Sequence, residues 1–171
     1  MNSEQRDRLF ATWLNDHVAI VQHVVQAFAP AADRPDLMQE ILLGLWRAVP
    51  AFQGGSQAST FVYRVAHNAA LQWHRTERQH RRRVSVAGEV DWMVRPEAGR
   101  SRGDTPARLE ALYAALQELP PLDRSLVLLS LDGLGYREIA EIHGLTESNV
   151  GARLTRARQR LTTLLNPSSA P

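Results

Sequence analysis

The amino-acid sequence contains no cysteine and no lysine among its 171 residues. A chain without cysteine forms no disulfide bond, no thiolate metal site and no cysteine nucleophile. A chain without lysine takes its positive side-chain charge from arginine, here from 20 residues. Each guanidinium group stays charged at physiological pH and can bind phosphate oxygens or the edge of guanine through two parallel hydrogen bonds.

Long apolar segments are also missing. The first residues are polar and apolar runs are only a few residues long, so the sequence predicts neither a secretory signal nor a membrane span. Hydrophobic residues make up 44% and charged residues 22% of the chain, as in a globular protein with one domain or two small ones. We therefore expect a cytoplasmic globular protein without membrane insertion.

The net charge is only +2, but the arginines are unevenly distributed. Residues 59–83 hold six arginines and one acidic residue. A second group follows Glu147 with no acidic residue among its members: Arg153, Arg156, Arg158 and Arg160. Two basic segments indicate a polyanion contacted at two places, while charge alone is equally compatible with two solvated helix faces.

The first part of the chain predicts two amphipathic helices. Apolar residues at spacings of three and four indicate a helix from about Phe10 to Phe28. A second helix is expected to begin between Asp33 and Asp36 and to end at Val49. Its apolar residues cover half of the circumference, and the other stripe is polar around one leucine: Asp36, Gln39, Glu40, Leu43 and Arg47. This stripe is either an ordinary solvated face or a docking surface for another protein.

A third helix follows a loop signal at 53–56, with Ser59 or Thr60 as its N-cap. Apolar residues between Phe61 and Trp73 give this helix a buried face, and its later part is rich in arginine. Residues 84–107 have no helical period and contain several glycines and prolines, which predicts a flexible linker. Trp92, within this linker, has no assigned role.

Helical periodicity returns at residue 107 and predicts further helices up to Pro120 and from Leu122 to Leu131. After a glycine-containing turn, we expect a short helix over 136–143, closed by a glycine, and a long helix from Glu147 with Thr146 as its N-cap. A short helix, a glycine turn and a second helix with a basic outer face are typical of a helix-turn-helix motif.

The last helix separates an apolar stripe, from Val150 to Leu164, from a polar one. The polar stripe begins beside Ser148 and contains Asn149, Arg153, Arg156 and Arg160. Asparagine can pair with adenine and arginine with guanine in the major groove, and outer arginines can bind the DNA backbone. DNA binding is therefore favoured over an arginine-rich helix without a nucleic-acid partner.

The sequence contains no pattern of a catalytic or metal site. Its six histidines have no paired metal spacing, and most are expected at the surface or at helix ends. There is no phosphate-binding glycine loop and no nucleophile elbow. The i,i+4 pair Asp36 and Glu40 is explained more simply by a docking surface. We expect no enzyme activity, no cofactor and no metal.

Five segments, in order and at family spacing, resemble the motifs of bacterial extracytoplasmic-function (ECF) sigma factors: DLMQE at 36–40, FVYRVAHN at 61–68, LPPLDR at 119–124, GYREIA at 135–140 and RLTRAR at 153–158. The resemblance covers about residues 9–83 and 109–165. It implies an all-α fold of two small helical domains joined by a flexible linker. Sigma region 2 would occupy residues 1–83, the linker 84–107, region 4 residues 108–165 and a tail 166–171.

For region 2, the resemblance implies docking on the clamp helices of the largest RNA polymerase subunit through Asp36, Gln39, Glu40, Leu43 and Arg47. It implies that Asn68 captures an unstacked base of the minus-ten promoter element. Aromatic and basic neighbours would then contact the opened strand: Phe61, Tyr63, Arg64, Arg75, Arg78, Arg81 and Arg82.

For region 4, the resemblance implies docking on the polymerase flap and recognition of the minus-thirty-five element by the helix from Glu147. Gly151 and Ala152 depart from the family, in which many members have a basic residue and a serine there. The expected DNA contacts are Ser148, Asn149, Arg153, Arg156 and Arg160. Many relatives are also held inactive by an anti-sigma factor, although no residue of this sequence identifies such a partner.

These observations lead to the hypothesis of an alternative sigma factor that binds core RNA polymerase and promoter DNA and directs transcription initiation. One alternative is a stand-alone helix-turn-helix regulator, whose first 83 residues sense a signal or dimerise. Another is an interaction protein with solvated basic faces. A sigma factor depends on polymerase for tight promoter binding, whereas a regulator binds a palindromic site by itself.

Overall fold

The structure, a computed structural model, describes residues 2–55, 57–86 and 105–166. All regular elements in these ranges are helical: α1 (Ser3–Phe28), η1 (Ala31–Asp33), α2 (Arg34–Ala48), η2 (Val49–Ala51), α3 (Ala58–Val86), α4 (Thr105–Gln117), α5 (Pro121–Leu131), α6 (Tyr136–His143) and α7 (Glu147–Leu165). The expected all-α fold is confirmed. Both ends of the expected linker are helical, since α3 continues to Val86 and α4 begins at Thr105. The rest of the expected linker, including Trp92, lies outside the described residues, as does most of the expected tail.

The helix ends follow local chemistry at most of the expected positions. Thr146 is the N-cap of α7, because its hydroxyl accepts the Asn149 backbone N–H at 3.2 Å. Gly144 ends α6 in the left-handed conformation with φ 67°, which glycine adopts at little cost. The expected N-cap of α3 is wrong: the helix begins at Ala58, so Ser59 and Thr60 lie inside its first turn.

Helices α1, α2 and α3 form the first half of the molecule. Leu37, Ile41 and Leu45 of α2 are buried, and α2 packs against both α1 and α3. Three aromatic rings, from Trp13, Phe52 and Phe61, meet at centroid distances of 5.2–5.4 Å. Trp13 lies in α1, Phe52 follows η2, and Phe61 lies in α3. The aromatic cluster therefore joins these three parts of the bundle.

Helices α4 to α7 form the second half. The apolar stripe of α7 is buried from Val150 to Leu161, but Leu164 is 39% exposed, contrary to expectation. Arg124 of α5 is buried and donates to three backbone carbonyls, those of Leu116, Gln117 and Leu119. These hydrogen bonds satisfy carbonyl groups at the end of α4 that have no partner in the helix.

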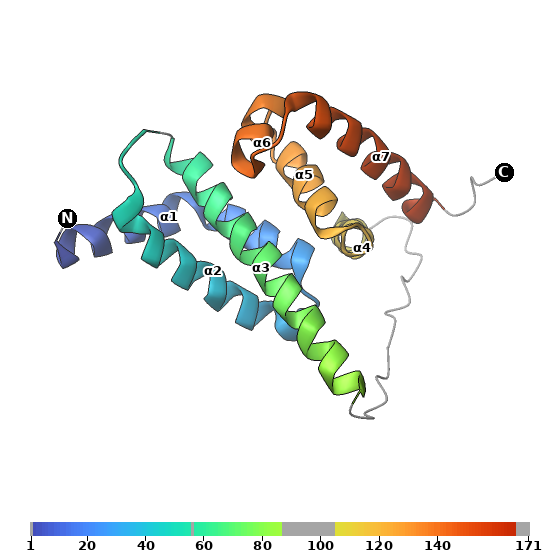
Figure 1. The fold of residues 1–171 in the computed structure, drawn as a ribbon, viewed down its shortest axis with the longest axis horizontal. Coiled ribbons are helices and arrows are strands. Elements are labelled where there is room, and N and C mark those ends of the chain that lie inside the picture. Colours follow the sequence, from blue (N-terminus) through green and yellow to red (C-terminus); the bar gives the residue numbers. More distant parts are fainter. Residues whose placement is uncertain (1, 56, 87–104, 167–171) are drawn as a thin grey trace.

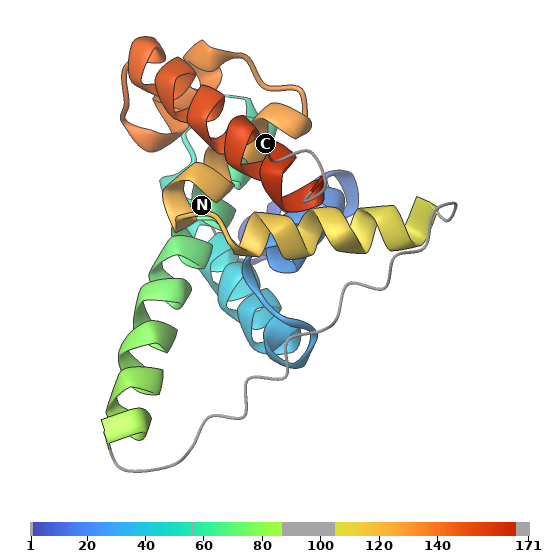
Figure 2. The ribbon, with the colours of Figure 1, turned by 90° about the vertical axis from the view of Figure 1, so that its right-hand side faces the viewer.

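The two halves pack against each other. Helix α1 contacts α4 and α5, while α3 contacts α5 and α6, as the two ribbon views show (Figures 1 and 2). Their buried apolar residues form a single hydrophobic cluster. The sequence predicts two helical domains but not this contact between them, which depends on residues far apart along the chain.

Candidate nucleic-acid and polymerase interfaces

The polar stripe of α2 lies on the outer surface of the first half. Its polar members are exposed, namely Asp36, Gln39, Glu40 and Arg47. Leu43, in the middle of the stripe, is 38% exposed, although the opposite side of the same helix is fully buried. Helix periodicity thus separates a packed face from a solvent face that presents one leucine among charged groups.

A second polar stripe runs along α3. Arg64, Asn68, Arg75 and Arg78 follow one another at spacings of four, seven and three, which places them on one side of the helix. Asn68, Arg75 and Arg78 are exposed, and Arg64 is half-buried. The C-terminal part of α3 projects beyond the other helices of the first half (Figure 2).

The remaining basic residues expected on this side differ in their surroundings. Arg81 contacts the carboxylates of Glu77 and Asp33, both at 2.9 Å. It therefore joins the end of α3 to η1. The side chain of Arg82 lies outside the part of the structure that is described.

The two aromatic residues expected beside the DNA strand are not freely exposed. Phe61 belongs to the aromatic cluster with Trp13. Tyr63 is half-buried where α3 meets the second half, and burial together with the Asp132 carboxylate raises the pKa of Tyr63 to about 12. Its phenol therefore stays neutral at physiological pH. In this arrangement Phe61 contributes to the core and Tyr63 to the contact between the halves.

The polar stripe of α7 faces solvent near the helix N-terminus. Ser148, Asn149, Arg156 and Arg160 are exposed. Arg153 is different, because its Nη1 lies 2.7 Å from Asp123 Oδ1 of α5 and its Nε donates to Asn149 Oδ1 at 3.1 Å. Its guanidinium group thus links α5 to the Asn149 side chain.

Gly151 of α7 lies close to the Tyr136 side chain of α6. A Cβ atom built at Gly151 would lie 3.3 Å from the Tyr136 ring, a tight contact. The absence of a side chain at Gly151 leaves room for the Tyr136 ring at its present position.

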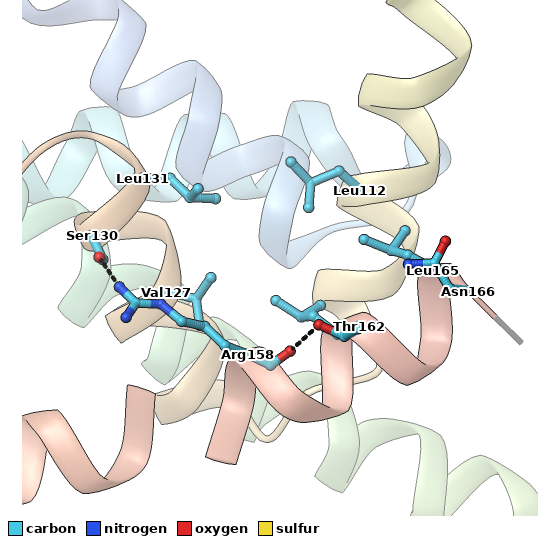
Figure 3. Close-up of a pocket in the computed structure, with 9 residues that line it drawn as sticks. Leu112, Val127, Ser130, Leu131, Arg158, Thr162, Leu165 and Asn166 are labelled. Carbon is cyan, nitrogen blue, oxygen red and sulfur yellow. Dashed lines mark hydrogen bonds between the residues drawn. The ribbon is translucent and has the colours of Figure 1, made fainter. Parts of the chain in front are cut away.

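An apolar groove lies between α4, α5 and α7 (Figure 3). Leu112, Val127, Leu131, Leu161 and Leu165 contribute to its lining. Arg158 lies along one side, where it donates to Ser130 Oγ at 2.8 Å. Leu131 is 57% and Leu165 41% exposed, so the groove presents two leucines to solvent.

The sequence interpretation missed a polar cluster between the halves. His67 of α3, expected with most histidines at the surface or a helix end, is fully buried. Its Nδ1 contacts Ser125 Oγ of α5, which also contacts His143 Nε2 of α6. No local pattern signals this cluster, because 58 positions separate His67 from Ser125 in the sequence.

Family models match both halves of the chain. The model of Sigma-70 region 2 matches residues 9–80, and that of Sigma-70, region 4 matches residues 109–161. The ECF RNA polymerase sigma-E factor of Escherichia coli (strain K12) is 31% identical over 160 residues, which cover 86% of this chain and 81% of the relative. The chain belongs to the ECF sigma factor family.

Other comparisons agree. The ECF RNA polymerase sigma factor EcfG of Rhodopseudomonas palustris (strain TIE-1) is 30% identical over 159 residues, which cover 89% of this chain and 84% of that protein. The sigma factor RpoE of Bartonella quintana, solved with the anti-sigma factor NepR, has the same fold, with a TM-score of 0.68 and 22% sequence identity. The match covers 91% of this chain and 95% of RpoE. CnrH, solved in complex with the cytosolic domain of CnrY, also has this fold, with a TM-score of 0.64 and 24% sequence identity. The match covers 95% of this chain and 91% of CnrH.

This protein is therefore an alternative sigma factor that directs transcription initiation, and a stand-alone regulator is not favoured. In the part of the chain that the structure describes, no helix is both long and apolar enough to cross a lipid bilayer.

Proposed function

We propose that this sigma factor contacts its partners through three helix faces. The polar stripe of α2 would bind the clamp helices of core RNA polymerase. The stripe of α3 would hold the opened minus-ten strand, with Asn68 binding an unstacked base. The exposed residues of α7 would read the minus-thirty-five element. The observation that carries the proposal is the presence of two separate arginine-bearing helix faces, one in each half.

On α3, Asn68 is the best candidate base reader because its amide is exposed on the same side as Arg75 and Arg78. An exposed amide can hydrogen-bond the edge of a base once the base leaves the stack, and the arginines can hold neighbouring phosphates. The binding energy offsets the few kcal/mol that unstacking costs. Phe61 and Tyr63 would then support the helix more than contact the strand.

On α7, Asn149, Arg156 and Arg160 would contact the major groove and its phosphates, with Ser148 at the helix N-terminus. Arg153 would act less directly, since Asp123 already binds its guanidinium group. A guanidinium group can bind DNA through two parallel hydrogen bonds only when its N–H groups face the DNA. Arg156 is therefore our main candidate for reading a guanine.

The groove between α4, α5 and α7 is the surface that we propose for the polymerase flap. Its apolar lining and exposed leucines suit an apolar segment of a partner protein. We place region 2 at residues 1–83, the linker at 84–107 and region 4 at 108–165. Like many relatives, the chain would have an anti-sigma factor as a further partner. It would act in the cytoplasm through binding, without a chemical step of its own.

Run-off transcription tests this function. Core polymerase with this protein, on genomic fragments, should give promoter-specific transcripts, and the protein alone should bind duplex DNA weakly. The Asn68→Ala variant should reduce promoter opening more than core binding, while Asn15→Ala, a matched change on α1, should alter neither. Absence of any specific transcript, together with a footprint of the isolated protein, would contradict the sigma assignment and favour a stand-alone regulator.

A further inference from the structure

The contact between the two halves contains a buried polar cluster that the proposed function does not use. Ser125 Oγ lies 2.5 Å from His67 Nδ1 and 2.8 Å from His143 Nε2. The histidine rings meet edge to face at a centroid distance of 6.0 Å. One histidine belongs to the first half, and the other belongs with the serine to the second, so this cluster spans the interface.

The surroundings of His67 determine where the protons lie. Its Nε2 atom is buried without a hydrogen-bond partner. An unpartnered buried N–H is rarer in proteins than an unpartnered acceptor, so the proton belongs on Nδ1 and is donated to Ser125 Oγ. The serine hydroxyl then donates to His143 Nε2. This directed chain of hydrogen bonds requires a neutral His143 as acceptor, and a charged His67 would bury an additional N–H, at Nε2, without a partner.

Other contacts across the interface do not depend on a neutral histidine in this way. Gln117 Nε2 donates to the backbone carbonyls of Gln26 and Ala29 at 3.1 and 3.2 Å. His23 Nδ1 lies 3.0 Å from Asp132 Oδ1, but the His23 side chain is 44% exposed, and exposed pairs of this kind contribute little to stability. The titratable and charged groups of this interface are His23, Tyr63, His67, His74, Arg124, Asp132, Glu138 and His143.

The closed arrangement cannot contact both promoter elements at once. A compact chain of this length has a radius of gyration of about 16 Å and is about 40 Å across. The minus-ten and minus-thirty-five elements lie about 25 base pairs apart, or about 85 Å of duplex at 3.4 Å per base pair. Promoter recognition by both halves therefore requires that the interface opens.

We propose that the α1–α3 face of the first half is an intramolecular docking surface for the second half, and that the His67–Ser125–His143 cluster is its latch. In this closed form the free protein covers Tyr63 and holds α3 and α7 too close together for a promoter. Acid, which charges the histidines, opens the latch. The consequence for transcription rests on the proposed function, whereas the latch itself does not.

The direction of the pH effect follows from burial. Burial, followed by repulsion from His143, lowers the pKa of His67 to about 3, and burial lowers that of His143 to about 4. In the open form both return toward the ordinary value near 6.5. The closed-to-open ratio is therefore highest above about pH 6.5 and falls as the pH decreases below this value. At pH 5.5 the closed-to-open ratio should fall about 10-fold through His67 alone and about 100-fold with His143.

A distance measurement on the free protein tests the latch. Because the chain has no cysteine, Ala31→Cys and Glu118→Cys provide two unique label sites. Both positions are exposed, and they are close in sequence to Ala29 and Gln117, which are hydrogen-bonded to each other across the interface. Spin-label distances should be short and narrowly distributed at pH 7.5 and should gain a long component at pH 5.5. An unchanged distribution at both pH values would overturn the proposal.

Two further variants separate the latch from general acid effects. His67→Phe removes the titrating group but keeps an aromatic ring, so the long component at pH 5.5 should fall several-fold. His80→Phe, the same change at an exposed position of α3, should keep the full response. Equal responses of the two variants would contradict the role of His67.

A crosslink tests the consequence for transcription. Joining the two introduced thiols with a reducible bifunctional maleimide should abolish initiation by the holoenzyme, and reduction should restore it. Full initiation by the crosslinked protein would show that opening is unnecessary and would overturn this part of the proposal. The distance measurement needs neither polymerase nor DNA, so a failed latch and a failed sigma assignment give different results.

Discussion

Arg124, Arg153 and Arg156 carry the same functional group in three different environments. Arg124 is 3% exposed, and burial lowers the pKa of its guanidinium group to about 10, which leaves it charged at neutral pH. It binds carbonyls at the end of α4 and lies 5.0 Å from the Phe28 ring centroid. Arg153 is half-buried beside Asp123, and Arg156 faces solvent. Only environment distinguishes a structural arginine from one available to DNA.

The Asp123–Arg153 ion pair should stabilise the second half measurably. Asp123→Ala leaves a half-buried guanidinium group without its carboxylate, so the free energy of unfolding should fall by about 1 kcal/mol. Glu141→Ala, which breaks the exposed pair with Arg137, should cost less than about 0.5 kcal/mol. Urea denaturation at pH 7.5 compares them, and equal losses would contradict a special role for Asp123.

Gly151→Ala should stabilise α7. Alanine in a helix interior is about 1 kcal/mol more favourable than glycine, and the atom that the new Cβ meets belongs to a Tyr136 ring that is 41% exposed and can shift outward. We expect a gain of about 0.5 kcal/mol in the free energy of unfolding, measured by urea denaturation. Gly151→Leu is the contrasting variant, because its side chain must displace the ring. A loss with alanine would show that the ring cannot move.

Among the elements, α2 shows how one helix combines stability and binding. Its buried residues are packed against α1 and α3, and its exposed stripe makes no comparable contribution to the core. Helix α3 has the same division along its length, since its first turns are packed and its last turns project (Figure 2). Substitutions of the buried residues of such a helix should reduce the stability of the fold, whereas substitutions of its exposed residues should reduce partner binding.

Leu43→Ala and Ile41→Ala form a matched pair on α2. Ile41 is fully buried, so its truncation should reduce the free energy of unfolding by about 2–5 kcal/mol. Leu43 is 38% exposed, so its truncation should cost at most about 1 kcal/mol. It should nevertheless weaken binding to core polymerase several-fold in a titration with labelled protein. Unchanged polymerase affinity of the Leu43 variant would contradict the proposed docking stripe.

For the whole molecule, the shared core couples the folding of the two halves. Gln117, Ser125 and the apolar residues around them bury surface that neither half covers alone. Calorimetry at pH 7.5 should therefore show one cooperative transition. At pH 5.5 the lowered pKa values of His67 and His143 favour the open form, so the transition should broaden or split. Two transitions at pH 7.5 would contradict the coupling, and His67→Phe should make the transition at pH 5.5 sharper than that of the unsubstituted protein.

Local sequence patterns were sufficient for most elements of this protein. Helix positions, the Thr146 cap and the solvent stripes of α2 and α7 follow from a period of 3.6 residues and from side chains that act within one turn. The family resemblance rests on the same local motifs. The exceptions are informative: α3 begins before Ser59, and Leu164 is exposed, because helix ends depend weakly on pattern.

The tertiary structure alone decided which polar side chains meet a partner on a distant helix. His67 and Arg153 have ordinary positions in their helices, and only Ser125 and Asp123, on another helix, make them part of an interface or an ion pair. Burial and desolvation arise when distant elements pack, so they leave no periodic signal. The sequence determined the helices and their faces; packing determined that the two halves close on each other.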